Sequence, residues 1–200
     1  GVFAPAENPL FENAGMITDA VWLDIDNDEW TDLVVVGEWM QPRFFMNRKG
    51  TLEEENLLDT PLNGLWQKVH PFDIDGDGDL DLVLANERQN YLYLNDGAGN
   101  FTGAAGRLPA IRESTSCVKA ADFDRDGDMD LFVGGRLVPG KYPHPADSYL
   151  LENQGGKLVD VTEAAAADRD YLVSVADFQA GEERHGRIPD GVRVLLRTGF

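Results

Sequence analysis

The chain has 200 residues, and its 36 acidic residues outnumber 17 basic ones, which gives a formal net charge of −19 at pH 7. This length suffices for one substantial domain with a hydrophobic core. The charge argues against nucleic acid and anionic membranes as partners, because both are bound by basic surfaces. The apolar runs are only a few residues long, so insertion into a membrane is not expected.

The first unit of the chain is predicted to contain four short strands and one acidic loop. A loop containing proline and glycine is expected over 4–19. An acidic nonapeptide at 24–32 separates the first strand from the second, and a connection is expected at 37–42. The strands, which are bounded by turn residues, are predicted at 20–23, 33–36, 43–46 and 51–54.

The same order of elements returns twice at a fixed period. The acidic nonapeptide begins at Asp24, again 49 residues later at Asp73, and after a further 49 residues at Asp122. Each copy lies between an apolar run and a strand-like run, such as 82–85 after the second copy. A period of this length with four short strands per repeat predicts an all-β chain built from β-propeller blades.

The third and fourth units depart from this pattern. In the third unit the distance from the acidic loop to Asn153 is longer than the matching distances to Asn47 and Asn95, which places an insertion at 139–145. Its prolines and glycine predict a surface loop. A degenerate fourth unit is expected at about 170–200, where two of the loop aspartates are missing and no metal is expected.

The second acidic loop, 73–81, holds five carboxylates in nine residues. So much negative charge needs a counter-ion, and a hard divalent cation with six to eight oxygen ligands is suitable. Oxygens at loop positions one, three and five converge on one point, position seven adds a backbone carbonyl, and position nine adds a carboxylate. Gly78 at position six permits the sharp turn. The pattern therefore predicts a calcium loop.

Two other calcium folds do not fit this spacing. An EF-hand requires a bidentate Glu at position twelve and helices on both sides. Position twelve is Val35, Leu84 and Val133 in the three loops, all within strand-like runs. The nonapeptide β-helix has a much shorter period, which leaves the propeller blade as the interpretation.

The sequence resembles the FG-GAP or VCBS repeats of seven-bladed propellers. That group includes cartilage-acidic-protein-like secreted proteins and has calcium blades like those of integrin α chains. The resemblance rests on Asp-x-Asp-x-Asp-Gly-x-x-Asp followed by a strand, at 73–85 and 122–133. Supporting stretches are 18–22 with 35–39, and the hairpin at 93–101. The resemblance covers roughly residues 14–163.

The resemblance implies blades of four antiparallel strands within a single partial propeller domain over 1–200. Three clear blades and one degenerate unit are expected, as a fragment of a larger, seven-bladed propeller that needs further blades in the full-length protein. The expected bounds are 14–56, 64–104, 113–163 and about 170–200.

The resemblance also implies two to three Ca²⁺ ions, each held by four aspartate side chains and one backbone carbonyl. Glu29 replaces the glycine of the other two loops at a position expected to need positive φ, so the first site should be strained or weaker. The side-chain ligands are Asp24, Asp26, Asp28 and Asp32, then Asp73, Asp75, Asp77 and Asp81, then Asp122, Asp124, Asp126 and Asp130. The carbonyl ligands are those of Trp30, Asp79 and Asp128.

The main functional hypothesis is a calcium-stabilised module for adhesion or for protein or glycan interaction, with structural metal and no catalysis. Extracellular calcium modules commonly bind with Kd of about 10⁻⁴ to 10⁻³ M, so such sites are filled outside the cytosol. This favours an extracellular, cell-surface or periplasmic location. The protein or glycan partner itself is not readable from the sequence.

Two alternatives remain open from the residues. A lectin-like propeller would use exposed aromatic residues such as Trp39, Trp66 or Tyr142 to stack on sugar rings, whereas Trp22 is expected in the core. A polysaccharide lyase or hydrolase would need acidic residues that metal binding already explains. His70 is expected to be simply packed.

Overall fold

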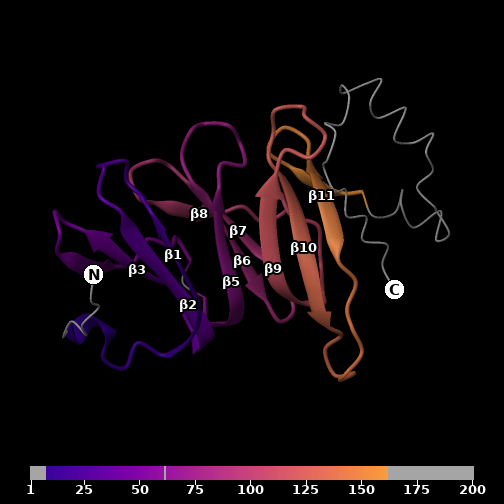
Figure 1. Ribbon diagram of the computed structural model, residues 1–200, viewed down its shortest axis with the longest axis horizontal. Coiled ribbons are helices and arrows are strands. Elements are labelled where there is room, and N and C mark those ends of the chain that lie inside the picture. Colours follow the sequence, from indigo (N-terminus) through magenta and orange to yellow (C-terminus); the bar gives the residue numbers. More distant parts are fainter. Residues whose placement is uncertain (1–7, 61, 162–200) are drawn as a thin grey trace, which may run out of the picture. The chain divides into compact units, whose positions relative to one another are not determined.

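The computed structural model describes residues 8–60 and 62–161, which form twelve β-strands and the short 3-10 helix η1, Pro9–Phe11 (Figure 1). No α-helix occurs in this part of the chain, and no helix there has the length and apolarity needed to cross a membrane. The all-β prediction is confirmed. The predicted fourth unit lies outside the described residues.

The strands fall into three groups of four in chain order, which we call blades one, two and three. Within each blade, consecutive strands pair antiparallel. Blade one contains β1 (Met16–Leu23), β2 (Asp32–Met40), β3 (Arg43–Asn47) and β4 (Leu52–Glu55). Blade two contains β5 (Gly64–Phe72), β6 (Asp81–Asn86), β7 (Tyr91–Asn95) and β8 (Phe101–Gly103). Blade three contains β9 (Ser114–Ala121), β10 (Asp130–Leu137), β11 (Tyr149–Asn153) and β12 (Leu158–Asp160).

The two larger hydrophobic cores lie between neighbouring blades. Residues of β6 alternate between them, because successive side chains of a strand point to opposite faces. Leu82 and Leu84 join a cluster shared with blade one, whereas Val83 and Ala85 join a cluster shared with blade three. This explains why β6 is continuously apolar over 82–85 instead of alternating with polar residues.

Strand β2 is longer than predicted. A connection was expected at 37–42, but β2 continues to Met40 and its far end pairs with β5 of blade two. Glu38 pairs with Met16 on one side and Leu65 on the other. These long-range pairings, which local sequence does not reveal, extend the strand and join blades one and two into one sheet.

The loop between β10 and β11 contains the predicted insertion, so that prediction is confirmed. The expectation of a loop through residue 19 is wrong at its end, because β1 begins at Met16. Before β1, the segment around η1 covers the face of blade one that points away from blade two. Leu10 packs there against Leu33, Val35 and Phe45.

Two aromatic residues lie where the sequence did not suggest. Trp22 was expected in the core but is 59% exposed, because Leu23 takes the core-facing position on β1. Trp66 was a candidate for sugar stacking but is 0% exposed, and its Nε1 donates a 2.7 Å hydrogen bond to the Met40 carbonyl. Trp39 and Tyr142 are exposed.

His70 is packed, as expected. Its Nε2 accepts a 3.1 Å hydrogen bond from the Ala120 N–H, which links blade two to blade three. Burial lowers the pKa of His70, and Lys119 and Lys68 lower it further. The ring is therefore held as a neutral acceptor between the blades.

Candidate metal centres

Each acidic loop joins the first strand of its blade to the second. Three carboxylates meet in every loop, from positions one, three and nine, with one ligand atom of each lying within 4.8 Å of the others. The groups are Asp24, Asp26 and Asp32; Asp73, Asp75 and Asp81; and Asp122, Asp124 and Asp130. The carboxylates of position five, Asp28, Asp77 and Asp126, are not part of these groups.

The first aspartate of a loop organises the backbone around it. Asp73 accepts hydrogen bonds from the Gly76 and Gly78 N–H groups at 2.8 and 3.0 Å. Asp24 likewise accepts two backbone bonds, here from the N–H groups of Asp28 and Glu29 at positions five and six, at 3.1 and 2.9 Å. The loop therefore folds back over its own first carboxylate, as short aspartate side chains favour in turns.

The aspartate at position nine is buried and accepts two backbone hydrogen bonds. Asp81 accepts from the Ile74 N–H at 3.0 Å and from the Asn95 N–H at 2.8 Å. The same pair of bonds recurs in the other blades, from Ile25 and Asn47 to Asp32, and from Phe123 and Asn153 to Asp130. Position nine is thus fixed between its loop and the end of the third strand.

Burial makes two of these carboxylates, Asp81 and Asp32, costly to ionise. It raises the pKa of Asp81 to about 6, and the carboxylates of Asp75 and Asp77 add to the shift. Burial also raises the pKa of Asp32, with Asp26 and Asp28 contributing. A cation among the oxygens would offset both the desolvation and the mutual repulsion.

Backbone positions four and six of each loop have positive φ. At position six φ is 68° for Glu29, 96° for Gly78 and 102° for Gly127, so the positive φ expected at Glu29 is confirmed. The sequence did not reveal position four, where Asn27, Gly76 and Arg125 have φ of 56°, 76° and 66°. Asparagine and glycine at position four are residue types that favour the left-handed backbone conformation, whereas the arginine of the third loop gives no such indication.

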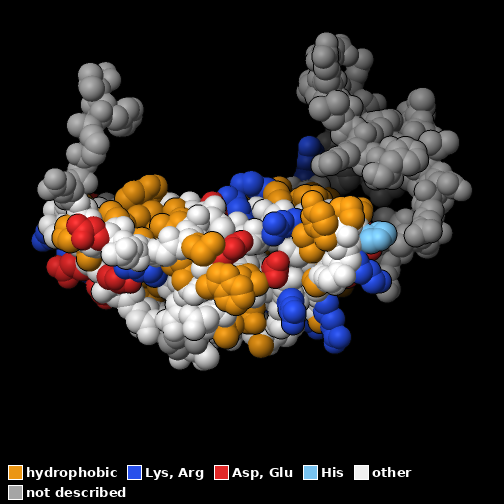
Figure 2. Space-filling view, turned by 90° about the horizontal axis from the view of Figure 1, so that it is seen from below, with side chains coloured by type: hydrophobic (Ala, Val, Ile, Leu, Met, Phe, Trp, Pro, Cys, Tyr) orange, Lys and Arg blue, Asp and Glu red, His pale blue; other side chains and the backbone are white. Residues whose placement is uncertain are grey.

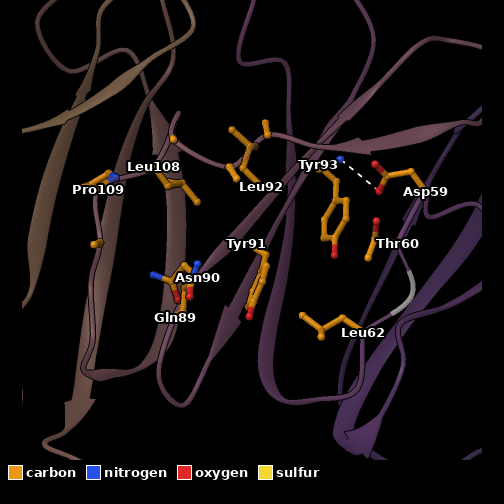
Figure 3. Close-up of a pocket in the computed structure, with 15 residues that line it drawn as sticks. Asp59, Thr60, Leu62, Gln89, Asn90, Tyr91, Leu92, Tyr93, Leu108 and Pro109 are labelled. Carbon is orange, nitrogen blue, oxygen red and sulfur yellow. Dashed lines mark hydrogen bonds between the residues drawn. The ribbon is translucent and has the colours of Figure 1, made fainter.

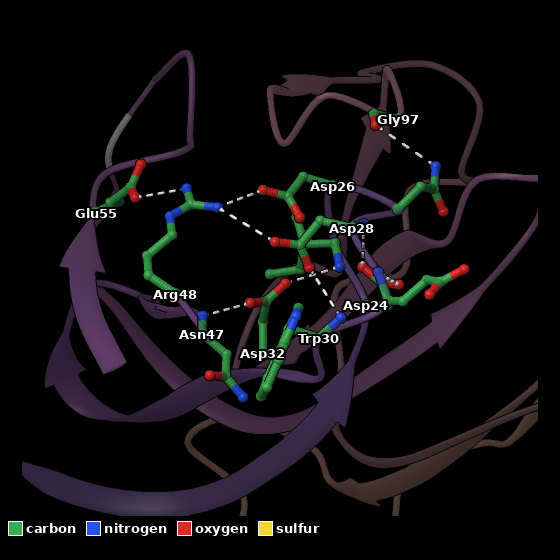
Figure 4. A network of polar contacts seen from close by, with 12 residues as sticks. Asp24, Asp26, Asp28, Trp30, Asp32, Asn47, Arg48, Glu55 and Gly97 are labelled. Atoms are coloured by element: carbon green, nitrogen blue, oxygen red, sulfur yellow. Dashed lines mark hydrogen bonds and ion pairs between the residues drawn. The ribbon is translucent and has the colours of Figure 1, made fainter. Parts of the chain in front are cut away.

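A basic residue that sequence reasoning missed contacts the first loop from the turn between β3 and β4 (Figure 4). Arg48 Nη1 lies 2.6 Å from Asp26 Oδ2, and Arg48 Nη2 lies 2.8 Å from Glu55 Oε1. These two bonds, the one to Asp26 first, raise the pKa of the Arg48 guanidinium. Arg107 makes a similar contact with Asp75 in the second loop, at 3.1 Å.

An unsatisfied oxygen shows that the first cluster fits a cation. Asp26 Oδ1 is buried and has no hydrogen-bond partner within the described residues. An orphaned carboxylate oxygen beside two further carboxylates is unfavourable unless a positive ligand satisfies it. The donor set of carboxylate oxygens is the one that hard divalent cations prefer.

The loops of blades one and two contact each other directly. Asn27 Nδ2 donates to Asp79 Oδ1 at 2.7 Å. The side chain of Asp79 is therefore used between the loops, which leaves its backbone carbonyl as the group expected to face a metal. Trp30, at the same position of the first loop, keeps its indole 40% exposed.

A separate hollow of about 470 Å³ lies beside β7 and β8 (Figure 3). Its lining includes Tyr93, Leu62 and Leu108. At one side, Asp59 Oδ1 accepts a 3.3 Å hydrogen bond from the Gly103 N–H. Burial raises the pKa of Tyr93, and Asp59 adds to that shift. Since the described residues of its lining include no Lys, Arg or His, they offer no cation to an anionic ligand.

Comparison with known proteins identifies the repeats. The family model described as FG-GAP-like repeat matches residues 24–84 and again residues 73–133, which together span more than half of the chain. A model described as putative cyclase matches residues 147–200, about a quarter of the chain and largely outside the described residues. No curated protein matches.

Proposed function

The chain belongs to the FG-GAP-like repeat family, and from this premise we propose that it is a calcium-stabilised binding module. The observation that supports this most directly is the repetition of one carboxylate cluster in three successive blades. In each cluster the buried aspartate of position nine connects the loop to the third strand. Such repetition is expected of a structural site and not of a single catalytic centre.

Ca²⁺ would be held in each blade by the aspartates of positions one, three and nine, with the remaining oxygens of the loop completing the shell. Bound calcium would supply positive charge where burial opposes ionisation of Asp32 and Asp81. It would also tie the first two strands of each blade together, so that binding free energy contributes to folding.

The partner of this module would be a protein or a glycan, bound without catalysis. Sites of extracellular affinity are filled only where calcium is abundant, which supports an extracellular, cell-surface or periplasmic location. Exposed aromatic residues support an interaction role, because Trp39 and Tyr142 are 76% and 85% exposed. Large exposed aromatic side chains favour binding surfaces.

Thermal unfolding tests the calcium proposal. The full chain is unfolded in EDTA, in millimolar calcium and in millimolar magnesium, and bound ions are counted by titration calorimetry. We expect calcium to raise Tm well above the EDTA value, with two to three ions bound. Asp75→Asn should reduce the shift, whereas Asp59→Asn, an exposed carboxylate outside the loops, should not. An unchanged Tm in calcium would refute the proposal.

A further inference from the structure

A hollow of about 380 Å³ opens where blade one meets blade two, at the opposite end of the strands from the acidic loops. It is lined by the end of β2, the start of β5 and the end of β6, namely by Trp39, Asn63, Gly64, Leu65, Asn86, Glu87 and Arg88. Figure 2 views the molecule from the side on which β10 ends in Figure 1 and shows hydrophobic side chains at the surface among basic ones.

Trp39 lines this hollow from a strained backbone position. Its φ is 59°, in the left-handed region that bulky side chains rarely adopt, and the pairing of β2 with β5 shifts register between Glu38 and Met40. Both neighbours are fixed, since Glu38 pairs with Leu65 and the Met40 carbonyl accepts from Trp66 Nε1. The bulge therefore directs the indole outward, and strain of this kind concentrates at functional sites.

The floor of the hollow requires a glycine. Gly64 pairs with Met40, and a Cβ at this position would collide with the Trp66 indole. A residue with a side chain would either push β5 away from Trp66 or fill the space beside Trp39. The close approach of the backbone therefore maintains the hollow.

Around the indole, several polar side chains lack partners among the described residues. Asn86 Oδ1 accepts from the Leu65 and Glu87 N–H groups at 3.0 and 2.8 Å, which fixes the amide. No described residue accepts a bond from Asn86 Nδ2, and the side chains of Asn63, Glu87 and Arg88 likewise make no hydrogen bond or ion pair with the described residues. The rim thus presents to a ligand neutral amide groups, one carboxylate acceptor and one guanidinium donor.

We propose that this hollow binds a neutral sugar ring of a glycan. A pyranose has an apolar C–H face that would stack on Trp39 and hydroxyl groups that would pair with Asn63, Asn86, Glu87 and Arg88. The volume is in the lower part of the range for small-ligand pockets, and one basic and one acidic rim residue favour a ligand without net charge. This inference rests on the proposed binding function and names its ligand class.

Other ligand chemistries fit less well. A basic side chain of a protein partner would stack on the indole, but it would meet both Glu87 and Arg88 at the rim and so gain no net electrostatic attraction there. An aliphatic side chain would stack on Trp39 but would leave the rim amides unpaired, which costs binding free energy. A sugar satisfies both the apolar face and the polar rim.

The test is binding of the full chain, in millimolar calcium, to an array of neutral and acidic oligosaccharides, followed by titration of the saccharide that binds. We expect a neutral saccharide to bind, and Trp39→Ala to weaken it about tenfold or more. Tyr142→Ala removes an aromatic side chain that is even more exposed but does not line the hollow, and this variant should bind as the native chain does. Trp39→Gly suits the positive φ and provides a folded variant should Trp39→Ala fold poorly.

Three results would overturn the inference. They are the absence of saccharide binding, equal binding by the native chain and Trp39→Ala, and preference for a basic peptide that Trp39→Ala abolishes. The calcium-dependent Tm shift is measured on the same samples. If that shift is present, failure concerns the sugar site alone, whereas its absence would count against the proposed function.

Discussion

Asn95 Nδ2 donates a 2.8 Å hydrogen bond to the carbonyl oxygen of Ile25, which lies in the acidic loop of the neighbouring blade. Asn153 repeats this bond to Ile74, also at 2.8 Å. The backbone N–H of each asparagine binds the position-nine aspartate of its own blade. One residue thus connects two acidic loops across a blade boundary.

The first prediction concerns this connection. Asn95→Ala should destabilise the chain by about 1–3 kcal/mol, because it leaves the buried Ile25 carbonyl without its donor. Asn47→Ala is the matched control, since Asn47 makes the turn bond to Gly50 and a bond to Thr31 within its own blade. Urea unfolding in saturating calcium compares the two variants. Equal losses would show that the bond between blades contributes nothing.

The second prediction concerns the strained first loop. Glu29→Gly should stabilise the chain by about 1 kcal/mol relative to Glu29→Ala, because only glycine adopts a φ of 68° without steric cost. Both variants remove the same charge, so their difference isolates the backbone. Calorimetric titration should show tighter calcium binding at the first site in Glu29→Gly than in Glu29→Ala. A preference for alanine would contradict the strain argument.

The third prediction concerns Arg48, which forms an ion pair with Asp26 of the first carboxylate cluster. Arg48→Gln should lower the Tm measured in EDTA, because Asp26 and Glu55 lose their common counter-charge. It should at the same time strengthen calcium binding at the first site, since calcium no longer competes with the guanidinium. Lys49→Gln removes the same charge from an exposed turn position and should do neither. Matching behaviour of the two variants would indicate only a net-charge effect.

The fourth prediction concerns pH. His70 has a folded pKa below its ordinary value of 6.5, owing first to burial and then to Lys119 and Lys68, with Asp19 opposing them. As the pH falls below about 6.5 the unfolded chain binds a proton before the folded chain does, so the free energy of unfolding decreases. Above that pH the contribution is fully present.

His70→Gln provides the comparison for this titration. Glutamine keeps an acceptor for the Ala120 N–H but does not titrate. Denaturant unfolding is measured between pH 5 and 7.5, a range that extends on the order of one unit to either side of the pKa of free histidine. As the pH falls, the free energy of unfolding should decrease more steeply for the native chain than for the variant. Parallel curves would mean that His70 does not set the pH dependence.

The sequence by itself determined the repeating chemistry of this protein. The all-β class, the repeat family and the insertion after β10 could be predicted because alternation, turn residues and aspartate spacing are local properties. Positive φ at Glu29 followed from its place in the loop for the same reason.

Only the tertiary structure decided which residues meet. Trp22 and Trp66 exchanged their expected places because burial depends on which strand face the next blade covers, and β2 reached Met40 because β5 supplied its partner. Residues far apart in the chain also form the ion pair between Arg48 and Asp26, the asparagine bonds between blades and the bulge at Trp39. Local chemistry specifies a loop or a strand, but pairing across a blade boundary is a property of the packed sheets.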